Sequence, residues 1–143
     1  MSSLSVESLL GGREVLGHEI ESEIDMYELG KEGIPKKSLL SLAASMDLSI
    51  RAMARILHIA ERTLQRKQEN DLLGEEISEH VIQLAEVYSR GAEVIGDSER
   101  FRNWLNAKSA AFRDRSPIEM LSSRYGAQMV LDELGRMEHG VVA

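Results

Sequence analysis

The sequence predicts an all-α protein, and three observations support this fold class. Apolar residues recur at helical spacing in several segments, and no segment alternates apolar and polar residues as a half-buried strand would. Glycine, proline and capping residues stand where these segments begin and end. We therefore expect about seven helices and no internal repeat.

The N-terminal part is interpreted as an arm followed by two helices. Residues 1–18 are punctuated by serine and glycine and are only weakly periodic, so we expect a loose arm there. From Glu19 onward the spacing predicts a helix, with apolar positions at Ile20, Ile24 and Tyr27 and stops at Gly30 and Gly33. Pro35 can open the next helix, whose predicted core face is Leu39, Leu42, Ala43 and Met46.

Two short helices, at residues 49–57 and 61–68, are separated by a tight turn, as in a helix-turn-helix. The helices of such a unit cross closely, and the small side chain of Ala54 suits that contact. Apolar side chains are expected to lock the pair together: Ile50, Met53, Ile59 and Leu64. The turn departs from the usual pattern, because His58 stands where glycine would supply a positive φ and Ala60 stands at an N-cap.

The longest predicted helix runs from Glu75 to Ile95 and ends at Gly96. Its apolar stripe consists of Ile77, Val81, Leu84, Ala85 and Tyr88. Asp97 or Ser98 is expected to cap the following helix. That helix places Phe101, Trp104 and Leu105 on its core side.

The segment "SPIE" has the composition of a helix start. Ser116 is the predicted N-cap, Pro117 takes the first helical position and Glu119 completes a capping box. A last helix is expected from about Tyr125 to Glu138, with Gly140 as its stop. We expect its apolar side and the preceding turn to pack onto Phe101 and Trp104, through Leu121, Val130, Leu131 and Leu134.

Composition limits the class of protein. Of the 143 residues, 43% are hydrophobic and 29% are charged, as in soluble globular domains. The absence of cysteine excludes a disulfide framework and a thiolate metal site. No apolar run approaches the roughly 20 residues that span a bilayer, and the first residues lack a signal pattern. These features predict a cytoplasmic protein.

Charge is distributed unevenly along the chain, although the total is -7. Residues 1–35 carry a net charge of -6, residues 36–69 carry +4 and residues 70–143 carry -5. A basic segment between acidic ones is typical of a site that binds phosphate, and it coincides with the helix-turn-helix. A solvated helix surface would show the same segregation, so this observation alone leaves both interpretations open.

The second helix of the pair carries side chains suited to reading DNA. Arg62, Thr63, Gln65 and Arg66 are expected to point outward, and arginine and glutamine pair with guanine and adenine edges. Arg51, Arg55 and Lys67 are candidates for phosphate contacts. The alternatives are an ordinary helical hairpin with a charged face, or a helix-turn-helix that serves mainly as a scaffold for a dimer.

Several segments together resemble a known family. These are "GIPKKSLLSLAASMDLSIRAMARILHIAERTLQRK", "LAEVYSRGAEVIGDSERFRNWLNAKSAAF" and "SPIEMLSSRYGAQMVLDELGRMEHGVVA". With the pair Trp104-Leu105, the start at Ser116-Pro117, and the ending formed by Leu134, Arg136 and Gly140, they are similar to the Xre/MbcA/ParS family of type II antitoxins. The resemblance covers about residues 25–143.

The resemblance implies partners and a mechanism. Members of this family bind a toxin encoded beside them, usually a RES-domain enzyme that consumes NAD+ or a related ADP-ribosyltransferase-like enzyme. Their C-terminal region covers the active-site cleft of the toxin. Their helix-turn-helix represses the shared promoter, typically as a homodimer or in a larger complex with operator DNA. The implied domains are an N-terminal arm at 1–18, an Xre-like helix-turn-helix region at 19–96 and a toxin-binding domain at 97–143.

Candidate toxin contacts lie in two places. The family tends toward a glycine-rich loop before the "SPIE" helix, but this chain has "AFRDRSP", so Arg113 and Asp114 suggest a changed turn and Arg113 and Arg115 are candidates for partner specificity. The other candidates are at the C-terminus, where a short tail could occlude a nucleotide site: Arg136, His139, Gly140, Val141, Val142 and Ala143.

No pattern in the sequence indicates catalysis. His18, His58, His80 and His139 are dispersed and lack metal-ligand spacing, so we expect no metal site and no cofactor. No nucleophile is paired with a base at recognisable spacing, and we expect no enzyme. Two hypotheses remain: an antitoxin that binds DNA and a toxin, and a stand-alone transcriptional regulator whose C-terminal half dimerises or senses a ligand.

Overall fold

The computed structural model describes residues 4–140, and the candidate contacts Val141, Val142 and Ala143 lie outside this range. Over the described range the chain is all-α, as the sequence predicts, and it contains no strand. A short 3-10 turn, Ala110–Phe112, precedes α9. The helices are α1 Val6–Leu9, α2 Arg13–Leu16, α3 Glu23–Glu32, α4 Lys36–Ser45, α5 Ile50–Leu57, α6 Glu61–Arg66, α7 Glu75–Ile95, α8 Ser98–Asn106, α9 Pro117–Met120 and α10 Arg124–Glu138.

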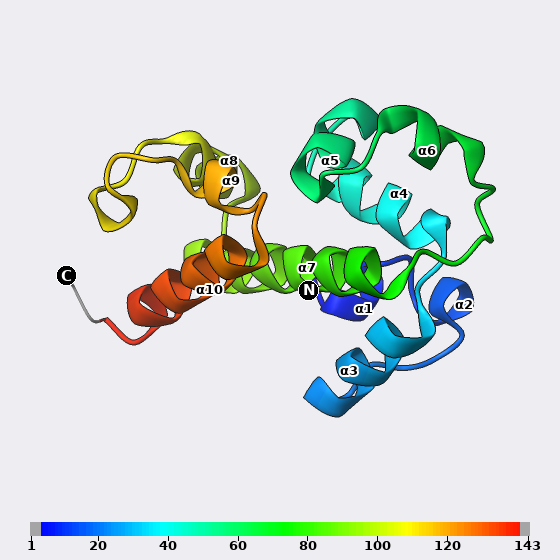
Figure 1. The fold of residues 1–143 in the computed structure, drawn as a ribbon. Coiled ribbons are helices and arrows are strands. Elements are labelled where there is room, and N and C mark those ends of the chain that lie inside the picture. Colours follow the sequence, from blue (N-terminus) through cyan, green and yellow to red (C-terminus); the bar gives the residue numbers. More distant parts are fainter. Residues whose placement is uncertain (1–3, 141–143) are drawn as a thin grey trace.

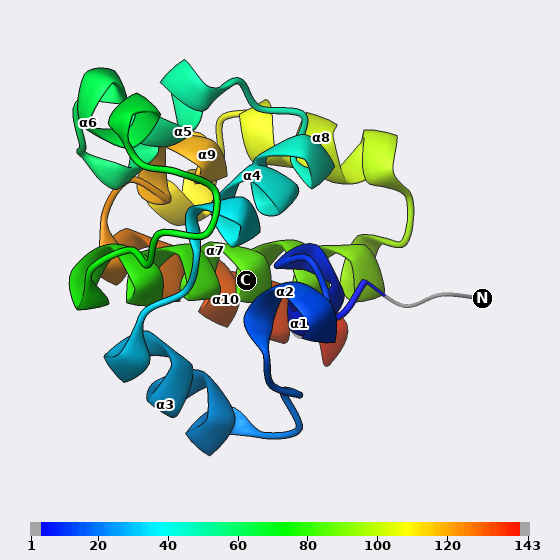
Figure 2. The same cartoon turned by 90° about the vertical axis from the view of Figure 1, so that its right-hand side faces the viewer.

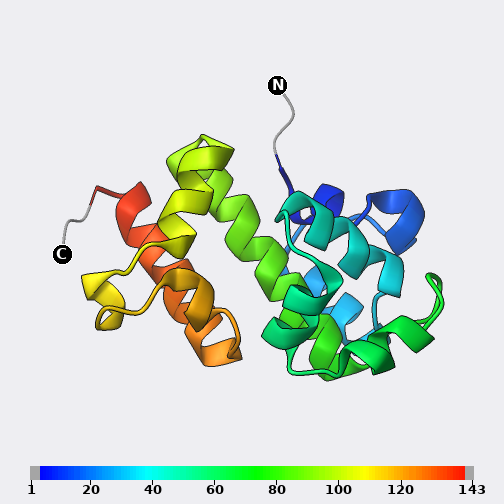
Figure 3. The ribbon, with the colours of Figure 1, turned by 90° about the horizontal axis from the view of Figure 1, so that it is seen from above.

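Helix α7 is the axis of the molecule. It contacts α1, α3, α4, α5, α8 and α10, so every larger part of the fold is packed against it. Helices α1 to α6 and helices α8 to α10 lie on different sides of it (Figure 1, Figure 3). Helix α10 runs along α7, with contacts to Glu79 at its start and to Arg90 at its end. Its 21 residues match the range predicted from periodicity, because both of its long sides are apolar at helical spacing.

The N-terminal segment differs from the loose arm that the sequence predicts. From Leu4 onward it folds into the short helices α1 and α2, which contact α4 and α7. Leu9 and Leu10 are fully buried, and Leu16 is 7% exposed. The spacing of serine and glycine indicates only the local preference of the backbone. The leucines become buried because α4 and α7 cover them, and that contact exists only in the folded chain.

Helix α3 corrects a second expectation. Gly30 does not stop it; the helix continues to Gly33, whose φ of 94° ends the run. A Cβ on Gly30 would lie 2.8 Å from the side chain of Glu79 on α7, so this glycine permits close packing of the two helices. Ile24 and Tyr27 have helical spacing but are 59% and 55% exposed, because α3 turns the opposite side toward α7.

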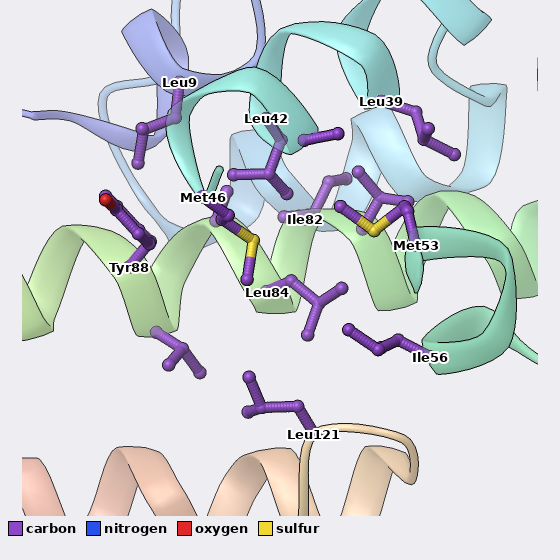
Figure 4. Packing of buried hydrophobic residues seen from close by; sticks show 14 of the residues in the cluster. Leu9, Leu39, Leu42, Met46, Met53, Ile56, Ile82, Leu84, Tyr88 and Leu121 are labelled. Atoms are coloured by element: carbon purple, nitrogen blue, oxygen red, sulfur yellow. The ribbon is translucent and has the colours of Figure 1, made fainter. Parts of the chain in front are cut away.

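The hydrophobic core lies between α7 and the helices that cover it. The predicted face of α4 is confirmed, since Leu39, Leu42, Ala43 and Met46 are all buried. Figure 4 shows side chains of α1, α4 and α5 packed on one side of α7, and Leu121 packed on the other side. Helices α4 to α6 lie on one side of α7 and α3 lies on the other (Figure 1, Figure 2).

Local signals set the ends of the C-terminal helices as predicted. Gly96 ends α7 with a φ of 83°, and the carboxylate of Asp97 accepts hydrogen bonds from the backbone of Glu99 and Arg100. Phe101 is buried with its ring centroid 5.2 Å from that of Tyr88 and 6.2 Å from that of Trp104. The expected apolar positions Leu121, Val130 and Leu134 are fully buried, and Leu131 is half-buried.

Candidate nucleic-acid and partner interfaces

The turn between α5 and α6 has a positive φ at the position where the helix-turn-helix pattern predicts one. His58 adopts φ 57° and ψ 41°, the left-handed region, so the predicted positive φ is confirmed at a residue other than glycine. Its backbone N–H donates to the carbonyl oxygen of Arg55 at 3.2 Å, which closes α5. The predicted N-cap, Ala60, gives α6 no side-chain hydrogen bond.

Packing between α5 and α6 leaves the candidate DNA contacts free. Ala54, Met53 and Leu64 are buried in the core, and Ile50 and Ile59 are half-buried. The opposite side of the unit is exposed at every predicted base contact: Arg62, Thr63, Gln65 and Arg66. Of the predicted phosphate contacts, Arg51 and Arg55 are exposed and Lys67 is half-buried.

One polar side chain in this surface was absent from the predicted contacts. Glu61 is the first residue of α6, and its Oε1 lies 3.3 Å from Nε of Arg51. Its Oε2 accepts a hydrogen bond from Nε2 of Gln65 at 3.1 Å. The i, i+4 spacing of Glu61 and Gln65 is visible in the sequence and would have indicated the second contact, but the approach of Arg51 depends on how α5 crosses α6.

The acidic helix α3 lies away from this surface. Helix α3 carries much of the negative charge of the first 35 residues and is separated from α5 and α6 by α7 (Figure 1, Figure 2). Exposed charges farther apart than the Debye length of about 8–10 Å are largely screened at physiological salt. The net charge of -7 is therefore not a measure of the local charge around α5 and α6, where residues 36–69 carry +4.

The loop between α8 and α9 forms a tight turn. Arg113 and Asp114 have φ values of 53° and 66°, in the left-handed region that glycine favours. Phe112 is buried and anchors the turn, and Ser109 and Arg115 are joined by a 3.1 Å backbone hydrogen bond. The backbone thus keeps a glycine-like path at the two positions where the sequence suggested a change, while the side chains of Arg113 and Arg115 are exposed.

The end of α10 lies beside an open polar groove between α3, α7 and α10. Arg136 contacts Glu133 with its Nη2 2.7 Å from Oε1, and Arg90 of α7 contacts Glu138 at 3.2 Å. Burial and the nearby charge of Glu23 raise the pKa of the Glu86 carboxyl in this groove. The structure therefore brings the candidates Arg136 and His139 together, whereas Arg113 and Arg115 belong to the separate loop before α9.

A buried histidine joins the N-terminal part of α7 to the C-terminal helices. The Nε2–H of His80 donates to the carbonyl oxygen of Leu121 at 2.8 Å, and burial lowers the pKa of its ring. Beside it, Nε of Arg124 donates to Oε1 of Gln83 at 2.6 Å, and Nη1 of Arg124 lies 3.2 Å from Glu79. These contacts fix the start of α10 against α7.

Two further features of the described part of the chain are the grouping of its potential metal-ligating side chains and the length and apolar character of its helices. Between residues 4 and 140, no group of three histidine, aspartate or glutamate side chains is placed to hold a metal ion. Among the helices described, none has the length and apolar character needed to cross a membrane.

Two family models match the chain, one on each side of the middle of α7. Residues 25–86 match the antitoxin Xre-like helix-turn-helix domain. Residues 90–140 match the antitoxin Xre/MbcA/ParS C-terminal toxin-binding domain. The chain belongs to the Xre/MbcA/ParS-type antitoxins.

A curated relative agrees with this family. The protein named antitoxin Xre from Yersinia enterocolitica (serotype O:8 / biotype 1B) is 31% identical over 85 residues. The match covers 58% of this chain and 57% of the relative, so the chain spans little more than half of that protein's length.

Two glycines allow close packing in the C-terminal part of the chain. A Cβ on Gly126 would lie 2.1 Å from the carbonyl oxygen of Met120, which only the absence of a side chain avoids. A Cβ on Gly91 of α7 would lie 2.2 Å from the ring of Phe101. The capping box predicted at Ser116 and Glu119 is confirmed, and the hydrogen bonds that Ser116 donates lower the pKa of the Glu119 carboxyl.

Proposed function

We propose that this protein neutralises a RES-domain toxin that consumes NAD+ and represses the operon that encodes both proteins. The observation that carries the proposal is that a helix-turn-helix domain and a toxin-binding domain share one continuous helix, α7. In this proposal the protein has no catalytic role of its own. It acts in the cytoplasm as a homodimer within a larger complex with toxin and operator DNA.

The proposed DNA contacts are the exposed side chains of α6 and its neighbours. Arg62, Gln65 and Arg66 project from a helix whose other side is fixed by Leu64 in the core, so their direction is set by packing. Arginine and glutamine provide paired donors and acceptors for base edges in the major groove. The proposed set is Arg51, Arg62, Thr63, Gln65, Arg66 and Lys67.

Replacing both exposed arginines of α6 tests this assignment. We expect Arg62→Ala with Arg66→Ala to abolish operator binding, because each lost base contact costs roughly 1–3 kcal/mol. Toxin neutralisation should persist, because both side chains are exposed on α6, outside the residues that match the toxin-binding domain. The measurement is binding to the promoter DNA of its own operon, alongside survival of cells that express the toxin.

A charge-matched control separates base contact from general electrostatics. Arg13→Ala with Arg100→Ala removes two exposed arginines elsewhere, and operator binding should remain. If the Arg62 and Arg66 variant loses neutralisation and keeps DNA binding, the proposed division of labour is contradicted.

The proposed toxin contacts comprise the loop arginines Arg113 and Arg115 and the C-terminal residues from Arg136 through Ala143. We expect deletion of the residues after Glu138 to release the toxin, because the tail is the segment proposed to enter the active-site cleft. DNA binding should persist in this variant, since the deleted residues follow α10 whereas the candidate DNA contacts lie on α5, on α6 and directly after α6. A truncated protein that still neutralises the toxin would refute occlusion by the tail.

The identity of the toxin is tested by co-expression. The product of the open reading frame beside this gene should be lethal alone, should deplete cellular NAD+, and should be harmless when this protein is present. If operator binding is intact but the neighbouring frame encodes no toxic product, the protein is a stand-alone regulator.

A further inference from the structure

Glu61 places a carboxylate inside the basic surface of the helix-turn-helix. Its neighbours Arg51, Arg62 and Arg66 are exposed and cationic, whereas the Glu61 side chain is only 34% exposed. A carboxylate at this position repels DNA phosphates, which weakens any binding that depends on phosphate charge alone. Its presence at the start of α6 therefore requires an explanation beyond affinity for DNA.

The hydrogen bond between Glu61 and Gln65 offers an explanation for the carboxylate at this position. The Glu61 carboxylate can only accept hydrogen bonds, so the amide group of Gln65 must turn its NH₂ toward Oε2, which it does at 3.1 Å. One N–H and the carbonyl oxygen of that amide remain free. These are the donor and the acceptor with which glutamine pairs with N7 and N6 of adenine.

The contact with Arg51 fixes the other side of the carboxylate. Nε of Arg51 lies 3.3 Å from Oε1 of Glu61, so the guanidinium group of α5 is held beside the first turn of α6. Its terminal nitrogens remain available for a phosphate oxygen. The same carboxylate thus orients one candidate base contact and one candidate phosphate contact.

We propose that Glu61 determines the sequence specificity of this helix-turn-helix by positioning Gln65, while its charge weakens binding to DNA of any sequence alike. This inference rests on the proposed DNA-binding function. The inference adds Glu61 to the proposed DNA-binding residues. The charge of Glu61 weakens binding to DNA, and its role is to raise the preference for the correct sequence over others.

The experiment compares variants on a defined set of probes. The full-length protein selects binding sites from a random-sequence duplex pool, and affinities are then measured for the selected duplex and for a shuffled duplex of equal length. The variants are Glu61→Ala, Glu61→Gln, Gln65→Ala and the pair Glu61→Ala with Gln65→Ala. Glu69→Gln is the control, because it removes an exposed carboxylate from the same basic segment.

We expect Glu61→Ala to bind the shuffled duplex about threefold more tightly, because a charge that repels phosphates is gone. The ratio of selected to shuffled affinity should fall about tenfold, with loss of preference at the base pair where Gln65→Ala also loses it. The double variant should be no less selective than Gln65→Ala alone, because Glu61 acts through Gln65. Glu61→Gln should show an intermediate loss, and Glu69→Gln should keep the ratio.

Two results would overturn the inference without touching the proposed function. The first is a Glu61→Ala protein that selects the wild-type site with an unchanged ratio, which would make Glu61 a brace between helices only. The second is an equal fall in the ratio for Glu69→Gln, which would show an effect of net charge. A wild-type protein that selects no site overturns the proposed DNA recognition itself, and this inference with it.

Discussion

Gly126 lies in the first turn of α10, and its backbone is pressed against the preceding turn. The Cβ of any other residue would meet the carbonyl oxygen of Met120 at 2.1 Å and its carbonyl carbon at 2.9 Å. Both atoms are backbone, so the contact cannot be relieved by a change of rotamer. Glycine is thus required at this position because two segments of backbone approach closely. It is not required for a positive φ, since Gly126 has none.

We expect Gly126→Ala to destabilise the protein by about 3 kcal/mol, because relieving the clash requires a shift of α9 against α10. Gly135→Ala is the matched control on the same helix, where the nearest atom to a new Cβ is Nη1 of Arg90 at 4.0 Å. That change should be neutral or should stabilise by up to about 1 kcal/mol through helix propensity. Urea unfolding measures both, and equal losses would contradict the clash.

At two other positions the backbone has the positive φ that glycine favours, but the residue is not glycine. His58 and Arg113 both adopt positive φ without being glycine. His58 ends α5 and Arg113 follows the buried Phe112, so the surrounding structure imposes the conformation in each case. The turn backbone is therefore retained while a charged or polar side chain is presented at the surface.

At the scale of elements, α7 connects the two domains and carries the groups that join them. His80 donates to Leu121, and Arg124 contacts both Gln83 and Glu79, so the start of α10 is tied to the N-terminal half of α7. The helix-turn-helix model and the toxin-binding model meet between residues 86 and 90, inside the same helix. The two matched domains therefore share one continuous, packed helix.

We expect the stability of the protein to fall as the pH drops below the ordinary histidine pKa of 6.5, because burial lowers the pKa of His80 in the folded state. The unfolded chain then binds a proton that the folded chain excludes, so stability present above that pH is lost below it. The loss attributable to His80 between about pH 7.5 and about pH 6 should be at most about 1 kcal/mol.

Urea unfolding across this pH range measures the effect. The His80→Gln variant lacks the titrating ring, so its stability should vary less with pH than that of the wild type. His139→Gln, which replaces an exposed histidine at the end of α10 by the same residue, is measured alongside as the control for the substitution. If His80→Gln retains the wild-type slope, the dependence arises elsewhere.

At the scale of the whole molecule, the fold separates charges that the sequence places close together. The acidic helix α3 ends only a few residues before the basic segment begins, yet α7 stands between α3 and the surface formed by α5 and α6. A protein with a net charge of -7 can therefore present a basic face.

We expect binding to the selected DNA to weaken with salt, and Arg55→Ala to reduce the slope of log affinity against log salt concentration by about 0.9 for each protomer. Arg55 is exposed on α5 and is a candidate phosphate contact, so its loss should weaken binding to all sequences equally. Arg100→Ala on α8 should leave the slope unchanged. A change in base preference for Arg55→Ala would contradict a phosphate contact.

The sequence by itself determined the features that depend on neighbouring residues. Helix periodicity defined α4 and α7, the composition of "SPIE" defined the capping box, and the turn at His58 required the positive φ that it has. Helix caps and helix periodicity depend on interactions within a few residues of the chain. They can therefore be predicted from the sequence without knowledge of the tertiary structure. The exposure of the candidate DNA contacts on α6 followed from the same local pattern.

Only the tertiary structure decided which surfaces meet. Leu9 and Leu10 are core residues because α4 and α7 cover them, whereas Ile24 is exposed because α3 turns its other side inward. The need for glycine at position 126 and the contact of Glu61 with Arg51 likewise arise between separate segments. Periodicity states that a helix has an apolar side, but packing against the rest of the chain selects which residues are buried and which charges lie together.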